Sequence, residues 1–200
     1  MKHPVSREFF TYWDTKRGEA RAPERSDIEP NDLRELLADI FVLSYDDAAS
    51  YPFRVAGTRV CALFGRDMKD QSFPALFSRQ HRRDIAEIIA AVAEEMLPAV
   101  AGLTATSPVG APIHLELLLL PFNNRAHSPI SLTGVLAPFE TGHRGALSEL
   151  QLTSWRYIHP PQQRLVPRAL RKLAIARGFM VYDGGGRSIP AQSDDGPSAA

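Results

Sequence analysis

Three successive apolar runs constrain the fold of this chain more than any other feature of its sequence. They cover residues 99–106, 113–122 and 130–139, and the short loops between them carry proline, glycine and asparagine. Apolar runs of this length that are bounded by turn residues predict β-strands. Because short loops connect strands that are neighbours in space, we expect the three strands to form an antiparallel meander.

A long amphipathic helix precedes these strands. Within residues 79–97, charged side chains separate apolar residues that recur at steps of three and four, namely Ile85, Ile88, Ile89, Val92 and Met96. This spacing places the apolar residues on one face of a helix. Pro98 follows and stops the helix, because proline has no backbone N–H to donate.

The first half of the chain adds two strands and several short helices. Residues 40–45 and 51–56 are β-branched and aromatic runs whose spacing suits an antiparallel hairpin. Residues 58–65 and the segment around Phe73 have helical spacing. A five-stranded antiparallel sheet with helices on one face satisfies this order of elements. We therefore expect an α+β fold with an apolar cavity between the helices and the sheet.

Helices are also expected before the first strand. Residues 31–38 follow Pro30, which suits the first turn of a helix. Residues 5–17 predict a short N-terminal helix that gathers three aromatic side chains on one face: Phe9, Phe10 and Trp13. Three large aromatics need a substantial apolar surface. Either a second copy of the chain or the chain's own sheet supplies it, so these residues are a candidate dimer interface, with internal packing as the equal alternative.

The composition changes after residue 139. Residues 140–182 contain seven basic and two acidic residues and include a candidate basic patch: Arg164, Arg168, Arg171, Lys172 and Arg177. These are either solvated residues of a surface helix or a patch for phosphate or an acidic protein. Residues 183–200 are rich in glycine and serine and predict a disordered tail. The expected organisation is a domain over 1–139, a basic, partly helical extension over 140–182, and the tail.

The composition excludes several classes of protein. The 23 basic and 23 acidic residues balance, so no global field draws the chain to nucleic acid or to a membrane. No apolar run is long enough for a signal peptide or a bilayer span, which predicts a cytoplasmic protein. Cys61 is the single cysteine, so the chain can form neither an intrachain disulfide nor a zinc site of several thiolates.

Five segments of the sequence are similar to a known family. They are residues 10–13 (FTYW), 17–18 (RG), 23–30 (PERSDIEP), 53–58 (FRVAGT) and 63–66 (LFGR). Together they resemble small single-domain PAS proteins of alphaproteobacteria, the PAS_5 type, first described as a domain of unknown function. The resemblance extends over residues 6–139. It implies a PAS fold and a regulatory role, and it implies no common ligand.

Motifs for catalysis are absent from the sequence. The chain has no G-x-S-x-G, H-E-x-x-H or P-loop motif, and no G-x-G-x-x-G after a strand. Cys61 lacks the asparagine-cysteine-arginine context of the flavin-binding cysteine in light-sensing PAS relatives, which favours a small core residue. For His81, a solvated helix start is favoured over an axial haem ligand. For His114 and Glu116, an exposed pair on one strand face is favoured over a proton-transfer pair. We predict no enzyme activity and no metal site, and the sequence indicates no cofactor.

Three functions are compatible with these features. The first is a signalling module with a small apolar ligand, for which the candidate pocket residues are Phe53, Val55, Leu63, Phe64, Phe77, Leu117 and Leu119. The second is a ligand-free adaptor whose outer sheet face recruits a regulatory protein. The third, a weak nucleic-acid binder that uses the basic patch, ranks behind both. The expected partners are a second copy of the chain, a regulatory protein and a small apolar ligand, and no membrane.

Overall fold

The computed structural model describes residues 1–45, 50–123, 130–140 and 146–159. The statements below refer to these residues. The tail over 183–200 and the whole candidate basic patch lie outside them: Arg164, Arg168, Arg171, Lys172 and Arg177.

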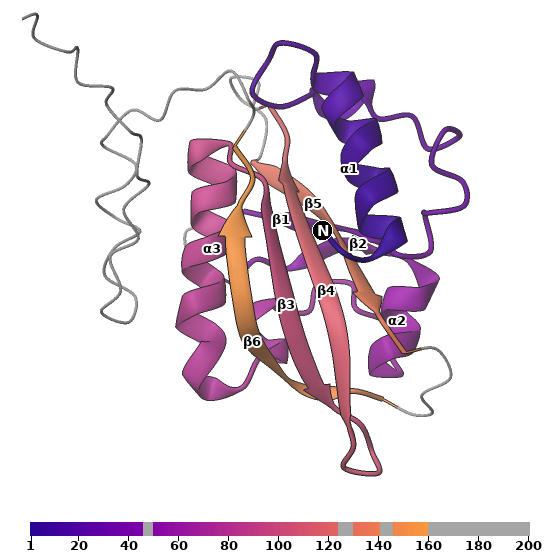
Figure 1. Cartoon of the computed structure of the whole chain (residues 1–200), viewed down its shortest axis with the longest axis vertical. Helices are drawn as coiled ribbons and strands as arrows, with labels where there is room; N and C mark the ends of the chain where they lie inside the picture. The colour runs from indigo at the N-terminus through magenta and orange to yellow at the C-terminus, as the bar shows by residue number, and fades with distance from the viewer. Residues whose placement is uncertain (46–49, 124–129, 141–145, 160–200) are drawn as a thin grey trace, which may run out of the picture. The chain divides into compact units, whose positions relative to one another are not determined.

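The strands form one antiparallel sheet (Figure 1). Their bounds are β1 (Ile40–Ser44), β2 (Phe53–Ala56), β3 (Ala99–Thr106), β4 (Pro112–Pro121), β5 (Ser131–Pro138) and β6 (Ser148–Tyr157). The strand order is β2-β1-β5-β4-β3-β6. The predicted meander is confirmed, because β4 pairs antiparallel with β3 on one side and with β5 on the other. The predicted hairpin is confirmed as β1 and β2, and β1 joins it to the meander by pairing with β5.

The sixth strand, β6, corrects the expected number of five strands. It pairs with β3 from Ala99 opposite Tyr157 to Thr106 opposite Ser148. β6 is an edge strand in which only Leu150 and Leu152 are buried, and most of its other side chains are polar. Two register shifts also break the alternation of its side chains, and for both reasons no period of two marks it in the sequence. Residues 148–157 therefore continue the sheet that the sequence analysis ended at residue 139.

The helices follow the predictions with two differences. They are α1 (Pro4–Arg17), α2 (Thr58–Phe64) and α3 (Arg82–Glu95), with the 3-10 turns η1 (Arg25–Asp27), η2 (Pro74–Leu76) and η3 (Arg79–His81). The long predicted helix starts as η3 and ends at Met96, which takes a left-handed backbone conformation with φ of 54°. The predicted helix over 31–38 is a series of turns. The carbonyl of Ala38 accepts hydrogen bonds from the first turn of α2, at Arg59 and Val60, so this segment turns to meet α2.

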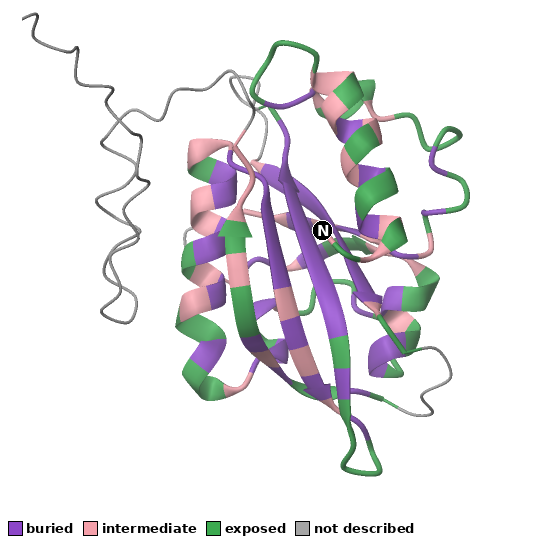
Figure 2. Ribbon diagram, in the orientation of Figure 1, coloured by how far each residue is buried: buried purple, intermediate pink, exposed green. Residues whose placement is uncertain are grey.

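Helices cover both faces of the sheet (Figure 1). On the inner face, α2 and α3 pack on the sheet, with Ile85 of α3 and Leu115 of β4 in one cluster, which we call the inner core. On the opposite, outer face, Phe9 and Trp13 of α1 share a second cluster with Leu118 of β4. Figure 2 shows that the central strands are buried along much of their length. None of the described helices is long and apolar enough to cross a bilayer.

Candidate functional site

The inner core lies where the sequence predicts a ligand pocket. Six of the seven candidate pocket residues are buried in it: Phe53, Leu63, Phe64, Phe77, Leu117 and Leu119. Four phenylalanine rings touch one another there, with centroids 5.3 Å apart for Phe41 and Phe73, 5.5 Å for Phe53 and Phe73, and 5.6 Å for Phe73 and Phe77. These are contact distances for aromatic pairs. The chain's own side chains therefore fill this part of the inner core.

Val55 is the exception among the candidate pocket residues. Its prediction rests on strand alternation, which places residues 53 and 55 on the same face. The pairing of β1 with β2 shifts register between Val42 and Leu43, so that Val42 lies opposite Val55 and Leu43 lies opposite Phe53. The bulge adds one residue to β2 and reverses the alternation. Val55 is therefore 51% exposed and lies outside the inner core.

Cys61 lies on α2 and packs, half-buried, against the inner core. Its Sγ atom is 3.9 Å from the carbonyl oxygen of Ala56, within reach of a weak thiol hydrogen bond. This placement agrees with the interpretation of Cys61 as a small residue at the edge of the core.

His81 is buried, and the interpretation of this residue as part of a solvated turn is wrong. It is 6% exposed, and its Nδ1 atom lies 3.7 Å from the nearer carboxylate oxygen of Asp84. The position is explained by the helical period, because residue 81 is four residues before the buried Ile85 and shares its face. The charged neighbours of His81 hide this signal, since they point away from the face that is buried.

Trp13 and Phe9 anchor α1 to the outer face of the sheet. Their exposed fractions are 0% and 1%, and the indole Nε1 of Trp13 donates a hydrogen bond of 2.9 Å to the carbonyl of Pro121 in β4. Phe10 is half-buried and stacks on Trp13, with ring centroids 6.0 Å apart. Of the two alternatives for these aromatics, the structure places Phe9 and Trp13 in internal packing. A dimer contact is left only to the partly exposed Phe10.

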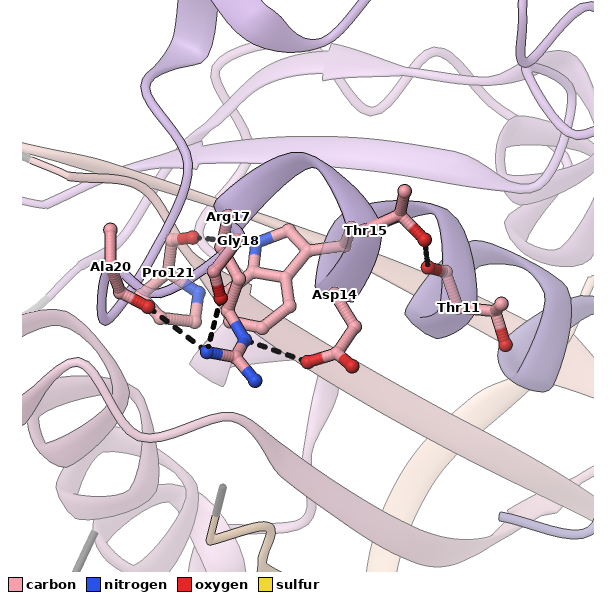
Figure 3. A network of polar contacts seen from close by, with 8 residues as sticks. Thr11, Asp14, Thr15, Arg17, Gly18, Ala20 and Pro121 are labelled. Atoms are coloured by element: carbon pink, nitrogen blue, oxygen red, sulfur yellow. Dashed lines mark hydrogen bonds and ion pairs between the residues drawn. The ribbon is translucent and has the colours of Figure 1, made fainter. Parts of the chain in front are cut away.

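Arg17 closes the C-terminal end of α1 (Figure 3). Its guanidinium donates to the carboxylate of Asp14 at 2.6 Å and to the carbonyls of Gly18 and Ala20 at 3.0 Å each. It also lies over the ring of Trp13, 5.9 Å from the ring centroid. Gly18 has a φ of 54°, a backbone conformation that favours glycine. The resemblance segments FTYW and RG therefore coincide with the residues that dock and end this helix.

Tyr12 and Lys16 tie the other side of α1 to the turns that precede β1. The Tyr12 hydroxyl accepts a hydrogen bond from the backbone N–H of Glu29 at 2.9 Å and donates to the carboxylate of Asp32 at 3.2 Å. Lys16 forms an ion pair with the same carboxylate at 3.3 Å. These contacts fix the turns at Glu29 and Asp32 against α1.

Glu116 holds the N-terminal end of α1 on the sheet. Its carboxylate is 5% exposed and accepts hydrogen bonds from the backbone N–H groups of Lys2 at 2.6 Å and His3 at 3.1 Å. The predicted exposed pair is therefore wrong for Glu116, whereas His114 is exposed. The sequence offers no local signal for this contact, because the partners are more than one hundred residues apart in the chain.

An ion pair between a buried carboxylate and an exposed guanidinium connects the segment before β1 to α2. The Asp39 carboxylate is 6% exposed and pairs with the Arg59 guanidinium, which is 61% exposed. Burial raises the pKa of Asp39 above its usual value, and the charges of Arg59 and then His3 partly oppose that rise. Since His3 precedes α1, the carboxylate lies where the N-terminal segment, the turns and α2 meet.

The outer face also carries a hollow of about 610 Å³ beside the N-terminal segment, which we call the outer hollow. Its floor is formed by β3, β4 and β6, and its lining includes Lys2, Gly102, Glu116, Phe139 and Arg156. Among these five residues, the sequence analysis considered only Glu116 as a candidate, as one member of the pair with His114. The described residues contain no group of three or more metal-ligating side chains.

The described residues form an antiparallel sheet with helices on both faces and a filled inner core, which is an α+β fold. A family model described as PAS domain matches residues 1–137. The chain therefore belongs to the PAS domain family, as its sequence resemblance predicts, and it is a domain of the sensory class.

Solved structures similar to this chain have low sequence identity to it. The LOV protein of Rhodobacter sphaeroides is 10% identical over 57% of this chain and 70% of that chain, with a TM-score of 0.42. The PAS domain of an HTR-like protein from Haloarcula marismortui is 18% identical over 55% and 90%, with a TM-score of 0.39. The PAS domain of a Colwellia psychrerythraea protein is 11% identical over 56% and 98%, with a TM-score of 0.41. No curated protein matches the chain.

Proposed function

We propose that this PAS domain acts in signal transduction through a partner protein and has no catalytic activity of its own. The family match over residues 1–137 supports a sensory role. β6 extends the same sheet, so the strands that the structure describes belong to one domain. In this proposal a partner protein carries the output.

The observation that carries this proposal is that β4 contributes side chains to the apolar clusters on both faces of the sheet. Leu117 and Leu119 of β4 belong to the inner core, whereas Leu118 and Leu120 belong to the cluster under α1. A shift of β4 that is driven from the inner core would therefore change the surface on which α1 docks. A partner that prefers one arrangement of α1 would respond to that change.

We propose that the domain acts primarily as a ligand-free adaptor. A sensor of a small apolar molecule is the second candidate function. The rings of Phe41, Phe53 and Phe77 each contact the ring of Phe73. An apolar ligand would enter this space only by displacing at least one ring. The second function is retained because six of the predicted pocket residues converge on the same core.

Partner capture with the full chain and two variants tests the adaptor function. Trp13→Phe removes the indole donor to Pro121 and loosens α1, whereas Arg83→Gln changes an exposed residue of α3 and serves as the control. We expect a protein that wild type and control retain equally and that Trp13→Phe binds about fivefold more or less tightly. Equal capture by all three proteins, or no specific capture at all, would refute the proposal.

Native mass spectrometry of the purified full chain distinguishes a sensor from a ligand-free adaptor. A sensor retains a bound molecule, or its melting temperature rises with one member of a metabolite panel. An adaptor shows the mass of the chain alone and a constant melting temperature. We also propose that the chain forms a homodimer, which analytical ultracentrifugation tests. We further propose that the basic patch contacts an acidic surface of the partner, and truncation after residue 163 tests this contact.

A further inference from the structure

The backbone register places side chains of three strands on the floor of the outer hollow. Gly102 of β3 lies opposite Ser154 of β6 on one side and opposite Glu116 of β4 on the other. In the next row on the same face, Val100 of β3 lies opposite Arg156 of β6. Paired residues share a face of the sheet. A glycine therefore lies at the centre of the floor, with a hydroxyl and a cation beside it.

The floor of the outer hollow is open because residue 102 is glycine. A Cβ atom at this position would lie 3.0 Å from the Ser154 hydroxyl oxygen and 3.0 Å from that of Thr153. The Thr153 hydroxyl is already used, since it donates a hydrogen bond of 2.8 Å to the carbonyl of Gly102. A side chain at residue 102 would crowd both hydroxyls and cover the floor.

The charged groups around the outer hollow differ in whether they have a hydrogen-bond or ion-pair partner. Both carboxylates in the lining accept hydrogen bonds from the backbone, Glu116 at 2.6 and 3.1 Å and Glu140 at 3.0 Å. Two cationic residues, Lys2 and Arg156, also line the hollow. Within the part of the chain that the structure describes, neither of these two cations has an ion-pair partner. The hollow thus offers charged donors to a ligand that supplies acceptors.

We propose that the outer hollow binds a small organic carboxylate. Arg156 and Lys2 would hold the carboxylate, because a guanidinium fork matches its two oxygens. The carbon skeleton would lie over Gly102 and extend toward the Phe139 ring, which lines the hollow and is 44% exposed. This site lies on the face of the sheet opposite the inner core, so it goes beyond the proposed function and depends on neither the apolar ligand nor the partner.

Titration of the full chain with benzoate, followed by calorimetry, tests this proposal. Benzamide has the same ring and shape without the charge, and acetate has the charge without the ring. We expect benzoate to bind roughly tenfold more tightly than either one, since both the ion pair and the apolar contact contribute. Inorganic phosphate distinguishes a general anion site: phosphate binding as tight as that of benzoate would overturn the assignment to organic carboxylates.

Three variants locate the site. Arg156→Gln should weaken benzoate binding roughly tenfold, and Gly102→Val should abolish it by covering the floor. Arg54→Gln changes an exposed arginine on β2, at the opposite edge of the sheet, and should leave binding unchanged. Circular dichroism and melting temperature establish that each variant is folded. Absence of benzoate binding to wild type, or equal binding to wild type and Arg156→Gln, would overturn the proposal.

Discussion

The ion pair between Asp39 and Arg59 allows a quantitative prediction. Arg59→Gln removes the guanidinium and leaves the buried Asp39 carboxylate with only the weaker influence of His3. Loss of one partner from a buried pair costs about 3–5 kcal/mol, whereas an exposed pair is worth about 0–1 kcal/mol. Because Asp39 is buried and the Arg59 side chain is 61% exposed, we expect an intermediate loss of about 2 kcal/mol in unfolding free energy at neutral pH.

The sign of the pH dependence follows from the direction of the pKa shift. Burial raises the pKa of Asp39 in the folded state above its usual value of 3.8. The folded state therefore binds this proton more tightly, and the resulting stabilisation is complete below the unfolded pKa and is lost as pH rises through the folded pKa. Arg59→Gln raises the folded pKa further. The cost of the substitution should therefore be smallest in acid and should grow toward neutral pH.

Urea unfolding at several pH values between about 3.5 and 7 measures this cost. Asp39→Asn supplies the matched background, in which Arg59→Gln should cost less than about 0.5 kcal/mol because no buried carboxylate remains. Arg83→Gln removes an exposed ion pair with Glu87 and should leave the urea midpoint unchanged, because exposed pairs contribute little to stability. The reasoning is refuted if Arg59→Gln costs the same at every pH or in both backgrounds.

Three further predictions follow from single contacts. Glu116→Gln should speed amide hydrogen exchange over residues 2–7 and leave exchange in α3 unchanged, because the charged acceptor of two backbone N–H groups is lost. Exchange over residues 2–7 at the wild-type rate would contradict the anchoring role. Gly57→Ala should lower the unfolding free energy by about 2–3 kcal/mol, since its Cβ would lie 2.3 Å from the carbonyl oxygen of Ala38; an unchanged urea midpoint would contradict this. Burial, with the charge of Glu95 next, raises the pKa of Tyr157 to about 12, so its stabilisation is full below the ordinary value of 10.0 and is lost as pH rises through about 12. Ultraviolet titration should therefore show a late phenolate that Tyr157→Phe removes, and its persistence in the variant would contradict the assignment.

Local periodicity was sufficient to predict most of the elements. The steps of three and four that include Ile85 mark α3, and the apolar runs with short loops mark β3, β4 and β5. These signals survive because α3 buries one continuous face, whereas β4 and β5 are covered on both faces and therefore read as nearly continuous apolar runs. The family could also be identified from short segments such as FTYW and RG, which in the fold contain the residues that dock and end α1.

Long-range contacts decided what the sequence left open. The β1–β2 bulge moves Val55 away from the inner core, although valine is apolar and strand alternation would place it beside Phe53. β6 is held by pairing with β3 and has few apolar residues of its own, so its sequence resembles that of a loop.

Burial of polar groups was decided in the same way. Glu116 and His81 look like surface residues in the sequence, and each is buried in the fold. For Glu116 the covering N-terminal segment lies more than one hundred residues away in the chain. The sequence by itself determined the class of domain, because local patterns fix which faces are apolar. Only the tertiary structure decided which polar groups those faces enclose and where a hollow remains, because both depend on the segments that pack from elsewhere in the chain.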